Sequence, residues 1–518
     1  MMNIDRRGFL AALFGTAAVS GLSQGLRVAP VLAVAKPAGL ALDSRRPQFH
    51  LLPAANWMND PNAPVFFKGR YHMFYQHNPD GAFWGDMHWG HAISPDMVHW
   101  THLPVALAPT ASGPDADGCF TGTTAVLDGK AAILYTGVHA APPDQATIKD
   151  GAHSLRETQC LATSDDPELR TWTKLPAPVI AAPPAELEVN GFRDPSPWRQ
   201  GDGWYMVLGS GIANRGGAVL LYKSRDLRNW EYVHVLAGRN QNGASAFDAF
   251  DPWEVWECPE FFALGDRHVL LYSTSGKVYW QSGVLDPKTM RFHADQAGIL
   301  DYGSFYAAKT QLDSSGKRIL WGWIPETRPL EEYKAAGWAG LMSLPRVLSM
   351  GADGRLRIGV AAEVNQLRGR VQTLSVTADE DSNRRQIEAM SLEGCSGEIL
   401  CTVQNATEPF ELVLSDSGGK AAPWLSLRYD PLRAGQVSID ARPLPVAPAA
   451  NGNVELHLYV DGSVIEVFVN GSIAFTKRFY PAGDIAPALR MNWTGKTAKI
   501  ASLSVWSLTP ISPDRLTA

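Results

Sequence analysis

The chain has 518 residues, of which 45% are hydrophobic and 19% charged, and its formal net charge is −6. This composition is typical of a globular protein, and the length exceeds what one hydrophobic core usually supports, so we expect two domains. The negative charge and the lack of a long run of Lys and Arg argue against nucleic acid as a partner, because a phosphate backbone requires a concentrated basic face.

Residues 1–35 have the pattern of a twin-arginine-type signal peptide. DRRGFL (5–10) is followed by an apolar stretch to about residue 22, and AVA (33–35) offers a cleavage site. The stretch is short and contains Gly and Ser, which disfavours a retained membrane anchor. We therefore expect an exported protein, secreted or periplasmic, that is not attached to a membrane once the signal is removed.

Five strand-like runs rich in aromatic and β-branched residues follow one another at intervals of roughly 50–70 residues: YHMFYQH (71–77), AILYTGV (132–138), WYMVLGS (204–210), HVLLYST (268–274) and RILWGWI (318–324). Such a period, with weak helical periodicity, is typical of β-propeller blades. The sequence predicts a five-bladed propeller over 36–350. The segment 139–158 is long for a propeller loop, and it would either reach over the centre of the propeller or remain exposed without a role.

An acidic residue precedes three of these runs by nearly the same interval. Asp60, Asp194 and Glu257 lie 14 or 15 residues before Tyr75, Leu208 and Tyr272 in the first, third and fourth runs. An offset of 15 residues before Tyr135 and Trp321 in the other two runs gives Phe120 and Tyr306. Equivalent positions on the innermost strands of a propeller surround its axis. A single Asp-Pro pair usually marks a turn, but three acids at a common offset predict a shared funnel.

Three clustered carboxyl groups suit the hydrolysis of a glycosidic bond. One carboxylic acid protonates the leaving oxygen, and a carboxylate on the other side of the sugar acts as nucleophile or activates water. Separations of about 5–5.5 Å favour retention of configuration, and about 6.5–9.5 Å favour inversion. Crowding raises the pKa of at least one acid. The spacing alone does not assign the roles.

The last third of the chain predicts a second all-β domain. Residues 351–372 have the composition of a linker, and 373–518 contain alternating strands such as 454–459 and 464–468, separated by a tight turn at Asp461-Gly462. We expect a β-sandwich. Cys395 and Cys401 could close a small disulfide loop. No Cys or His cluster has metal-ligand spacing, so we expect neither a metal nor a cofactor.

WMNDPNAP (57–64), FRDP (192–195) and WECPE (256–260) resemble the three signature motifs of glycoside hydrolase family 32, the invertase, levanase and inulinase family. The similarity runs from about residue 46 to 350 and resumes at 456–471. It implies an all-β fold, a five-bladed β-propeller followed by a β-sandwich, and a retaining mechanism on β-D-fructofuranosides.

Carried over residue by residue, the resemblance implies that Asp60 is the nucleophile, Glu257 the acid/base and Asp194 the residue that binds fructose hydroxyls and stabilises the transition state. It also implies a fructose pocket lined by Asn59, Gln76, Trp84, Phe120, Thr121 and Arg193. We add Tyr306 to these substrate-binding residues. Two residues depart from the family pattern. Ala63 replaces the more usual Gly, and Thr121 replaces a frequent Ser while keeping its hydroxyl.

These features favour an exported fructan hydrolase, acting on levan or inulin, that releases fructose or short fructo-oligosaccharides; sucrose is a further substrate. A levan fructotransferase forming a cyclic difructose, or a levanbiose-releasing enzyme, would use the same acids. An inverting arabinan-type glycosidase would lack WMNDPN, and a non-catalytic lectin would not need three acids at a common offset. The sequence leaves the oligomeric state open.

Overall fold

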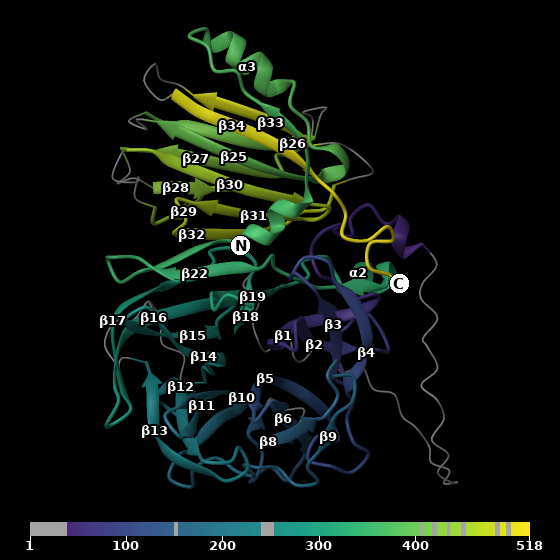
Figure 1. Cartoon of the computed structure of the whole chain (residues 1–518), viewed down its shortest axis with the longest axis vertical. Helices are drawn as coiled ribbons and strands as arrows, with labels where there is room; N and C mark the ends of the chain where they lie inside the picture. Colours follow the sequence, from purple (N-terminus) through teal and green to yellow (C-terminus); the bar gives the residue numbers. More distant parts are fainter. Residues whose placement is uncertain are drawn as a thin grey trace.

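A computed structural model describes residues 39–149, 154–239, 253–404, 408–416, 422–432, 436–446, 452–481, 487–493 and 499–517. The predicted signal peptide over 1–35 lies outside the described residues. Seven β-sheets make two bodies, a propeller and a sandwich stacked above it in Figure 1. The prediction of an all-β chain, with a five-bladed propeller followed by a β-sandwich, is confirmed.

Five sheets form the blades. Blade 1 contains β1 (Asn56–Phe67), β2 (Arg70–Asn78), β3 (His88–Ser94), β4 (Thr101–Leu107) and β20 (Trp338–Ala339). Blade 2 contains β5 (Gly118–Leu127), β6 (Lys130–Ala140), β7 (Ile148–Lys149), β8 (Ser154–Ser164) and β9 (Thr173–Lys174). Blade 3 contains β10 (Val189–Gln200), β11 (Gly203–Ile212), β12 (Gly216–Ser224) and β13 (Trp230–Gly238). Blade 4 contains β14 (Glu257–Leu264), β15 (Arg267–Thr274), β16 (Lys277–Asp286) and β17 (Arg291–Ile299). Blade 5 contains β18 (Tyr306–Leu312), β19 (Arg318–Ile324), β21 (Leu341–Met342), β22 (Arg346–Met350) and β23 (Leu356–Val360).

The first strands of the five blades form a closed ring in the order β1, β5, β10, β14, β18 and back to β1. The five runs found in the sequence are the second strands, β2, β6, β11, β15 and β19. They are buried at almost every position because neighbouring blades pack on both of their faces. The short strand β20 returns from blade 5 and pairs in parallel with β1. The ring therefore surrounds a single axis.

The linker is shorter than predicted. Within the range 351–372, β23 pairs with β22 of blade 5, and β24 (Arg368–Thr373) pairs with β34 (Lys499–Leu508) of the sandwich. Backbone hydrogen bonds thus assign both ends of this range to the domains. Residues 361–367, mostly the 3-10 helix η2 (Ala362–Leu367), remain as the connection.

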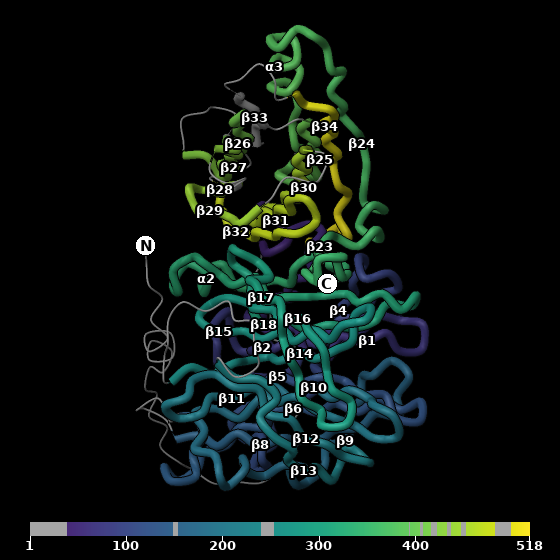
Figure 2. Tube along the Cα trace, turned by 90° about the vertical axis from the view of Figure 1, so that its left-hand side faces the viewer, coloured from purple at the N-terminus to yellow at the C-terminus, as the bar shows by residue number. Residues whose placement is uncertain are grey.

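The sandwich consists of two antiparallel sheets, which appear as separate layers in Figure 2. The six-stranded sheet contains β24, β34 (Lys499–Leu508), β25 (Ser396–Gln404), β30 (Val454–Asp461), β31 (Val464–Val469) and β32 (Ile473–Arg478). The five-stranded sheet contains β29 (Arg442–Leu444), β28 (Gln436–Ile439), β27 (Leu425–Asp430), β26 (Phe410–Asp416) and β33 (Pro487–Trp493). Aliphatic side chains such as Leu412, Leu427 and Leu458 fill the space between them.

The suggested Cys395–Cys401 disulfide is wrong. Cys395 ends the 3-10 helix η3 (Glu393–Cys395), and Cys401 lies within the extended strand β25 that follows. The six Cα-to-Cα steps from Cys395 to Cys401 span about 20 Å in extended chain, whereas a disulfide requires Cα atoms less than about 7 Å apart. The structure contains no disulfide between them.

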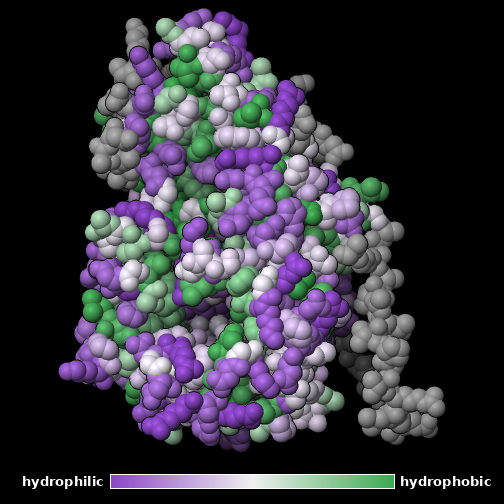
Figure 3. Space-filling view, in the orientation of Figure 1, coloured by the Kyte–Doolittle hydropathy of each residue, from purple (hydrophilic) through white to green (hydrophobic). Residues whose placement is uncertain are grey.

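Helices are few in the described part of the chain. They are α2 (Leu330–Ala336), α3 (Glu380–Glu388), and the 3-10 helices η1 (Leu40–Leu42), η2 and η3. Within the described residues, no helix combines the length and the apolar character needed to span a bilayer. Hydrophilic and hydrophobic residues are interspersed over the face drawn in Figure 3.

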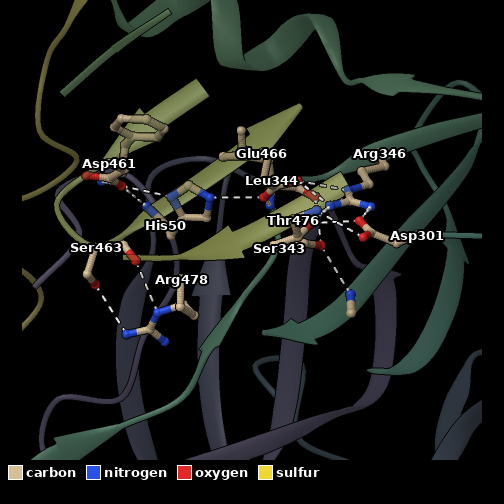
Figure 4. Close-up of polar contacts among 12 residues, drawn as sticks. His50, Asp301, Ser343, Leu344, Arg346, Asp461, Ser463, Glu466, Thr476 and Arg478 are labelled. Atoms are coloured by element: carbon tan, nitrogen blue, oxygen red, sulfur yellow. Dashed lines mark hydrogen bonds and ion pairs between the residues drawn. The ribbon is translucent and has the colours of Figure 1, made fainter. Parts of the chain in front are cut away.

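The two domains meet through buried charges (Figure 4). Arg346 of β22 donates to Asp301 in the propeller and to Glu466 of β31 in the sandwich, and all three side chains are fully buried. His50, from the segment that precedes β1, contacts Asp461 and Glu466 at 2.8 and 3.0 Å. Both domains and the N-terminal segment therefore share one polar network.

Candidate active site

Each innermost strand of the propeller carries a β-bulge, and the five bulges stand around the axis. In blade order they begin after Met58, Phe120, Arg193, Glu257 and Tyr306. A bulge leaves one or two residues outside the ladder and turns their side chains. The ring of bulges gathers the side chains of five distant chain segments at one place.

The three acids do not occupy equivalent positions, contrary to the expectation from their common offset. Glu257 is the last paired residue before its bulge, Asp194 is the first residue within its bulge, and Asp60 is the second within its own. The common offset of 14 or 15 residues therefore does not mark one position in the strands. The bulges nonetheless bring the acids together.

Asp60 accepts two hydrogen bonds from predicted site residues. Asn59 Nδ2 donates to Oδ1 at 3.0 Å, and Thr121 Oγ1 donates to Oδ2 at 2.8 Å. Burial raises the pKa of Asp60, and the charge of Glu257 raises it further, while the two hydrogen bonds act in the opposite direction. Asp60 therefore lies within the electrostatic reach of Glu257.

Asp194 is 3% exposed and adopts a left-handed backbone with φ of 65°. Its Oδ2 accepts a hydrogen bond from the backbone N–H of Cys258 at 2.8 Å. Burial raises the pKa of Asp194 to about 7, against the nearby charge of Arg193. The Cys258 thiol lies 3.4 Å from Asp60 Oδ2 and 3.5 Å from Asp194 Oδ2, so these two carboxylate oxygens are within about 7 Å of each other.

Glu257 is held from two sides. Arg193 Nη2 donates to its Oε1 at 2.9 Å, and the Tyr306 hydroxyl donates to its Oε2. Arg193 is itself oriented by Glu157, which accepts from Nη1 at 2.6 Å and is fully buried. Sequence reasoning missed Glu157, although it lies in the segment 139–158, whose length was noted. In the structure this segment contains the end of β6, the short strand β7 and the start of β8, with which β7 pairs.

Aromatic side chains form a cluster beside the carboxyl groups, and Tyr306 joins the cluster to Glu257. Trp84, Phe120 and Tyr306 pack against a cluster that includes Trp57 and Tyr333, and the rings of Trp84 and Phe120 meet edge-on at 5.9 Å. The sequence predicted the first three, but missed Tyr333 of α2, which no motif indicates. Flat rings of this kind stack on the apolar faces of sugars.

Gln76, on β2 of blade 1, contacts the backbone of blade 2. It is 3% exposed, and its Nε2 donates to the carbonyl oxygen of Cys119 at 2.9 Å, next to Phe120. Among the described residues, no group of three or more His, Cys, Asp or Glu side chains could hold a metal ion. The side chains present can exchange protons and attack an electrophilic carbon.

At the axis of this β-propeller, two carboxyl groups with raised pKa values, those of Asp60 and Asp194, lie beside a third, that of Glu257, and aromatic rings lie next to them. This fold and this site define a glycosidase. The comparisons with known proteins agree with this class. The models of the N-terminal and C-terminal domains of glycosyl hydrolases family 32 match residues 50–358 and 363–507. The chain belongs to glycosyl hydrolase family 32 and is a glycoside hydrolase.

Three relatives illustrate the similarity. A sucrose-6-phosphate hydrolase of Escherichia coli is 35% identical over 84% of this chain and 89% of its own length. A β-fructofuranosidase mutant of Bombyx mori, solved with sucrose, is 29% identical, with a TM-score of 0.73 over 90% of this chain and 95% of its own. A fructan 1-exohydrolase variant of Cichorium intybus, solved with 1-kestose, is 26% identical, with a TM-score of 0.73 over 90% and 98%.

Proposed function

We propose that this glycoside hydrolase is an exported, retaining β-fructofuranosidase that hydrolyses fructans (levan or inulin) and sucrose, releasing fructose or short fructo-oligosaccharides. The observation that carries the proposal is the position of Asp60, hydrogen-bonded by Asn59 and Thr121 and close to both other acids. The relatives support activity on sucrose or fructans in general, because the structure of one was solved with sucrose and that of another with 1-kestose.

The geometry supports a two-step mechanism. Asp60 attacks the anomeric carbon of the fructosyl unit while Glu257 protonates the departing oxygen, and a covalent fructosyl-enzyme forms. Glu257 then takes a proton from water, which attacks the same carbon and releases fructose with its configuration retained. The Tyr306 hydroxyl donates to ionised Glu257 and can accept from the protonated acid, so it serves both steps.

Asp194 and Arg193 support the reaction without making or breaking the bond to carbon. Asp194 faces the same space as Asp60, and when ionised it accepts hydrogen bonds from sugar hydroxyls and stabilises positive charge developing on the ring. Arg193 holds Glu257 in place through a charge-assisted hydrogen bond. The aromatic walls exclude water from the apolar face of the sugar.

Product analysis tests this function. Purified protein is incubated with levan, inulin, sucrose and sucrose-6-phosphate, and the products are separated by chromatography. Fructose or short fructo-oligosaccharides from levan or inulin support the proposal. A cyclic difructose would instead identify a fructotransferase, turnover of sucrose-6-phosphate alone would exclude a fructan hydrolase, and binding without turnover would identify a lectin.

Export is tested separately with the full chain. Expressed in a bacterium with twin-arginine transport, the chain is expected to reach the periplasm or medium and to lose its first 35 or so residues. Replacing Arg6 and Arg7 with Lys should keep it in the cytoplasm. Equal export of this variant and the unaltered chain would contradict the proposal.

A further inference from the structure

The segment between β19 and β21 leaves blade 5 and supplies one wall of the active site. It forms α2 and then β20, whose residues Trp338 and Ala339 pair in parallel with Asn56 and Trp57 of β1. The ring of Tyr333 in α2 lies 6.0 Å from that of Trp57. This segment, residues 325–340, thus abuts β1 just before the residues that hold Asp60.

A short series of contacts leads from α2 to Asp60. Trp57 is 2% exposed, and its Nε1 donates to Asn59 Oδ1 at 2.6 Å. Asn59 Nδ2 in turn donates to Asp60 Oδ1 at 3.0 Å. The orientation of the Asn59 amide is therefore set by Trp57, and Trp57 is packed against Tyr333. A displacement of α2 would reach the carboxylate through two hydrogen bonds.

The other side of this segment is attached to the sandwich. Glu326 accepts hydrogen bonds from the hydroxyl of Tyr480, which follows β32, and from the backbone N–H groups of Thr327 and Arg328. Arg328 donates to Glu326 at 2.7 Å and to the carbonyl oxygen of Trp338 at 2.9 Å. The Glu326 and Arg328 side chains are only 2% and 1% exposed.

Charge reinforces this attachment. Arg478 of β32 lies 3.5 Å from Glu326 and is anchored within the sandwich by Ser463 (Figure 4). Burial would raise the pKa of Glu326, but Arg478 and Arg328 lower it to about 2, so the carboxylate stays ionised. A buried, ionised group with several partners holds one geometry, because losing a partner leaves charge without compensation.

We infer that Tyr480 of the sandwich is a positioning residue for the active site, acting through Glu326, α2, Trp57 and Asn59 on Asp60. The sandwich would then tune substrate binding rather than only support the propeller. This inference deepens the proposed function and uses its reaction as one of two readouts. Contact alone does not establish coupling, so the test must measure coupling directly.

Tyr480→Phe removes one donor to Glu326 and leaves its charges and its backbone donors in place. The matched control is Tyr459→Phe, because the Tyr459 hydroxyl also donates to a buried glutamate, Glu398 at 3.3 Å, but one that lies within the sandwich, on β25. We expect Tyr480→Phe to raise KM for sucrose or fructan by about two- to thirtyfold, the range that mutations along coupled networks produce, with a smaller change in kcat. The control should leave both unchanged.

A double-mutant cycle and hydrogen exchange complete the test. Combined with Tyr333→Leu, Tyr480→Phe should add little to the rise in KM, because both changes act on the same contact series. Hydrogen exchange should increase in 325–340 and 56–60 for Tyr480→Phe but not for Tyr459→Phe. Unchanged exchange in these segments, or an active Tyr480→Phe enzyme with wild-type KM, would overturn the inference. An inactive wild-type protein would overturn the proposed function, while hydrogen exchange would still decide the inference.

Discussion

The carboxyl group of Asp60 is half-buried and has hydrogen-bond donors that favour its charged form. This combination suits a nucleophile, which must be ionised yet poorly hydrated. Asp60→Asn keeps the shape and the contacts to Asn59 and Thr121 but cannot form the covalent intermediate. We expect kcat on levan and sucrose to fall by about 10⁴-fold or more. Substantial remaining activity in steady-state assays would exclude Asp60 as the nucleophile.

The role of Glu257 as the proton donor is tested by how the activity of the Glu257→Gln variant depends on the leaving group of the substrate. Glu257→Gln cannot give a proton to the departing oxygen, so substrates with poor leaving groups should lose the most activity. Fructosides with good leaving groups should form the intermediate at a rate closer to that of the wild type. Single-turnover kinetics on a series of fructosides measure this. An equal loss on every substrate would mean that Glu257 is not the proton donor.

Thr121 is predicted to set the acid limb of activity. Its hydroxyl lowers the pKa of Asp60 against the effect of burial, so Thr121→Val should raise that pKa. Since Asp60 must be ionised to attack, the acid limb of kcat/KM should move to higher pH. Thr124→Val is the control. Thr124 lies on β5, as Thr121 does, but its hydroxyl donates to the backbone carbonyl oxygen of Ala63 on β1 and not to Asp60. Coincident pH profiles for the two variants would refute this role.

For the active site, the sequence predicts which residues take part better than it predicts where they lie in the strands. The three acids were found by offset, and the structure gathers them, but it places them at successive positions of the bulges rather than at one. A β-bulge has no consistent sequence signal. The bulged residue often adopts the right-handed helical conformation, which any residue tolerates, and several residues in the bulges of this protein, such as Asp194, have positive φ. Glu157 was missed because a buried glutamate is recognisable only from its partner, Arg193.

Among the elements, β20 makes a close backbone contact with β1. Gly340 has a positive φ of 79°, and a Cβ there would lie 1.9 Å from the carbonyl oxygen of Met58. Gly340→Ala should therefore push β20 away from β1, destabilise the fold by more than the roughly 1–2 kcal/mol of left-handed strain, and lower kcat/KM. Thermal unfolding and steady-state kinetics measure the two effects.

Gly316→Ala isolates the strain from the clash. Gly316 has a φ of 84°, and a Cβ there would meet nothing within 4 Å. The Gly316→Ala protein should lose only the roughly 1–2 kcal/mol of left-handed strain, with activity unchanged. If Gly340→Ala behaves like Gly316→Ala in both measurements, β20 does not position β1.

The repeating strands of the blades were predictable and the excursion at 325–340 was not. A blade strand extends over 7–12 residues in β1, β2 and β19, and the period of the repeat identifies it. The helix α2 has 7 residues and β20 has two, too short for a periodic pattern to emerge. Their positions are set by tertiary partners such as Arg328, which bonds to Glu326 and to the backbone of Trp338.

For the whole molecule, the buried charges between the domains are the feature that sequence reasoning could not supply. His50 and Asp461 are 411 residues apart, and nothing local in either segment indicates the other. Hydropathy assigns such residues to the surface, because isolated charges are rarely buried. Pairing reverses that expectation, since Arg346, Glu466 and Asp301 satisfy one another away from water.

This network predicts how stability depends on pH. Burial lowers the pKa of His50, but its bonds to Asp461 and Glu466 raise it by more, so the folded pKa lies above the ordinary value of 6.5. That contribution to stability is fully present below pH 6.5 and is lost as the pH rises through the folded pKa. Burial raises the pKa of Glu466, but Arg346 and His50 lower it by more, below 4.5. Its contribution is present above pH 4.5 and is lost as the pH falls through the folded pKa.

The melting temperature should therefore be highest between about pH 4.5 and 6.5, with His50 responsible for part of the alkaline decline. His50→Gln cannot become charged, so it should melt at a lower temperature at pH 6 and lose less further stability at alkaline pH than the wild type. His457→Gln is the control, because His457 also contacts a buried glutamate, Glu398 at 2.6 Å, but does not contact Asp461 or Glu466. Calorimetry from pH 4 to 9 measures the melting temperatures of the wild type and the two variants. Parallel curves for His50→Gln and wild type would mean that His50 does not carry its charge into the folded interface.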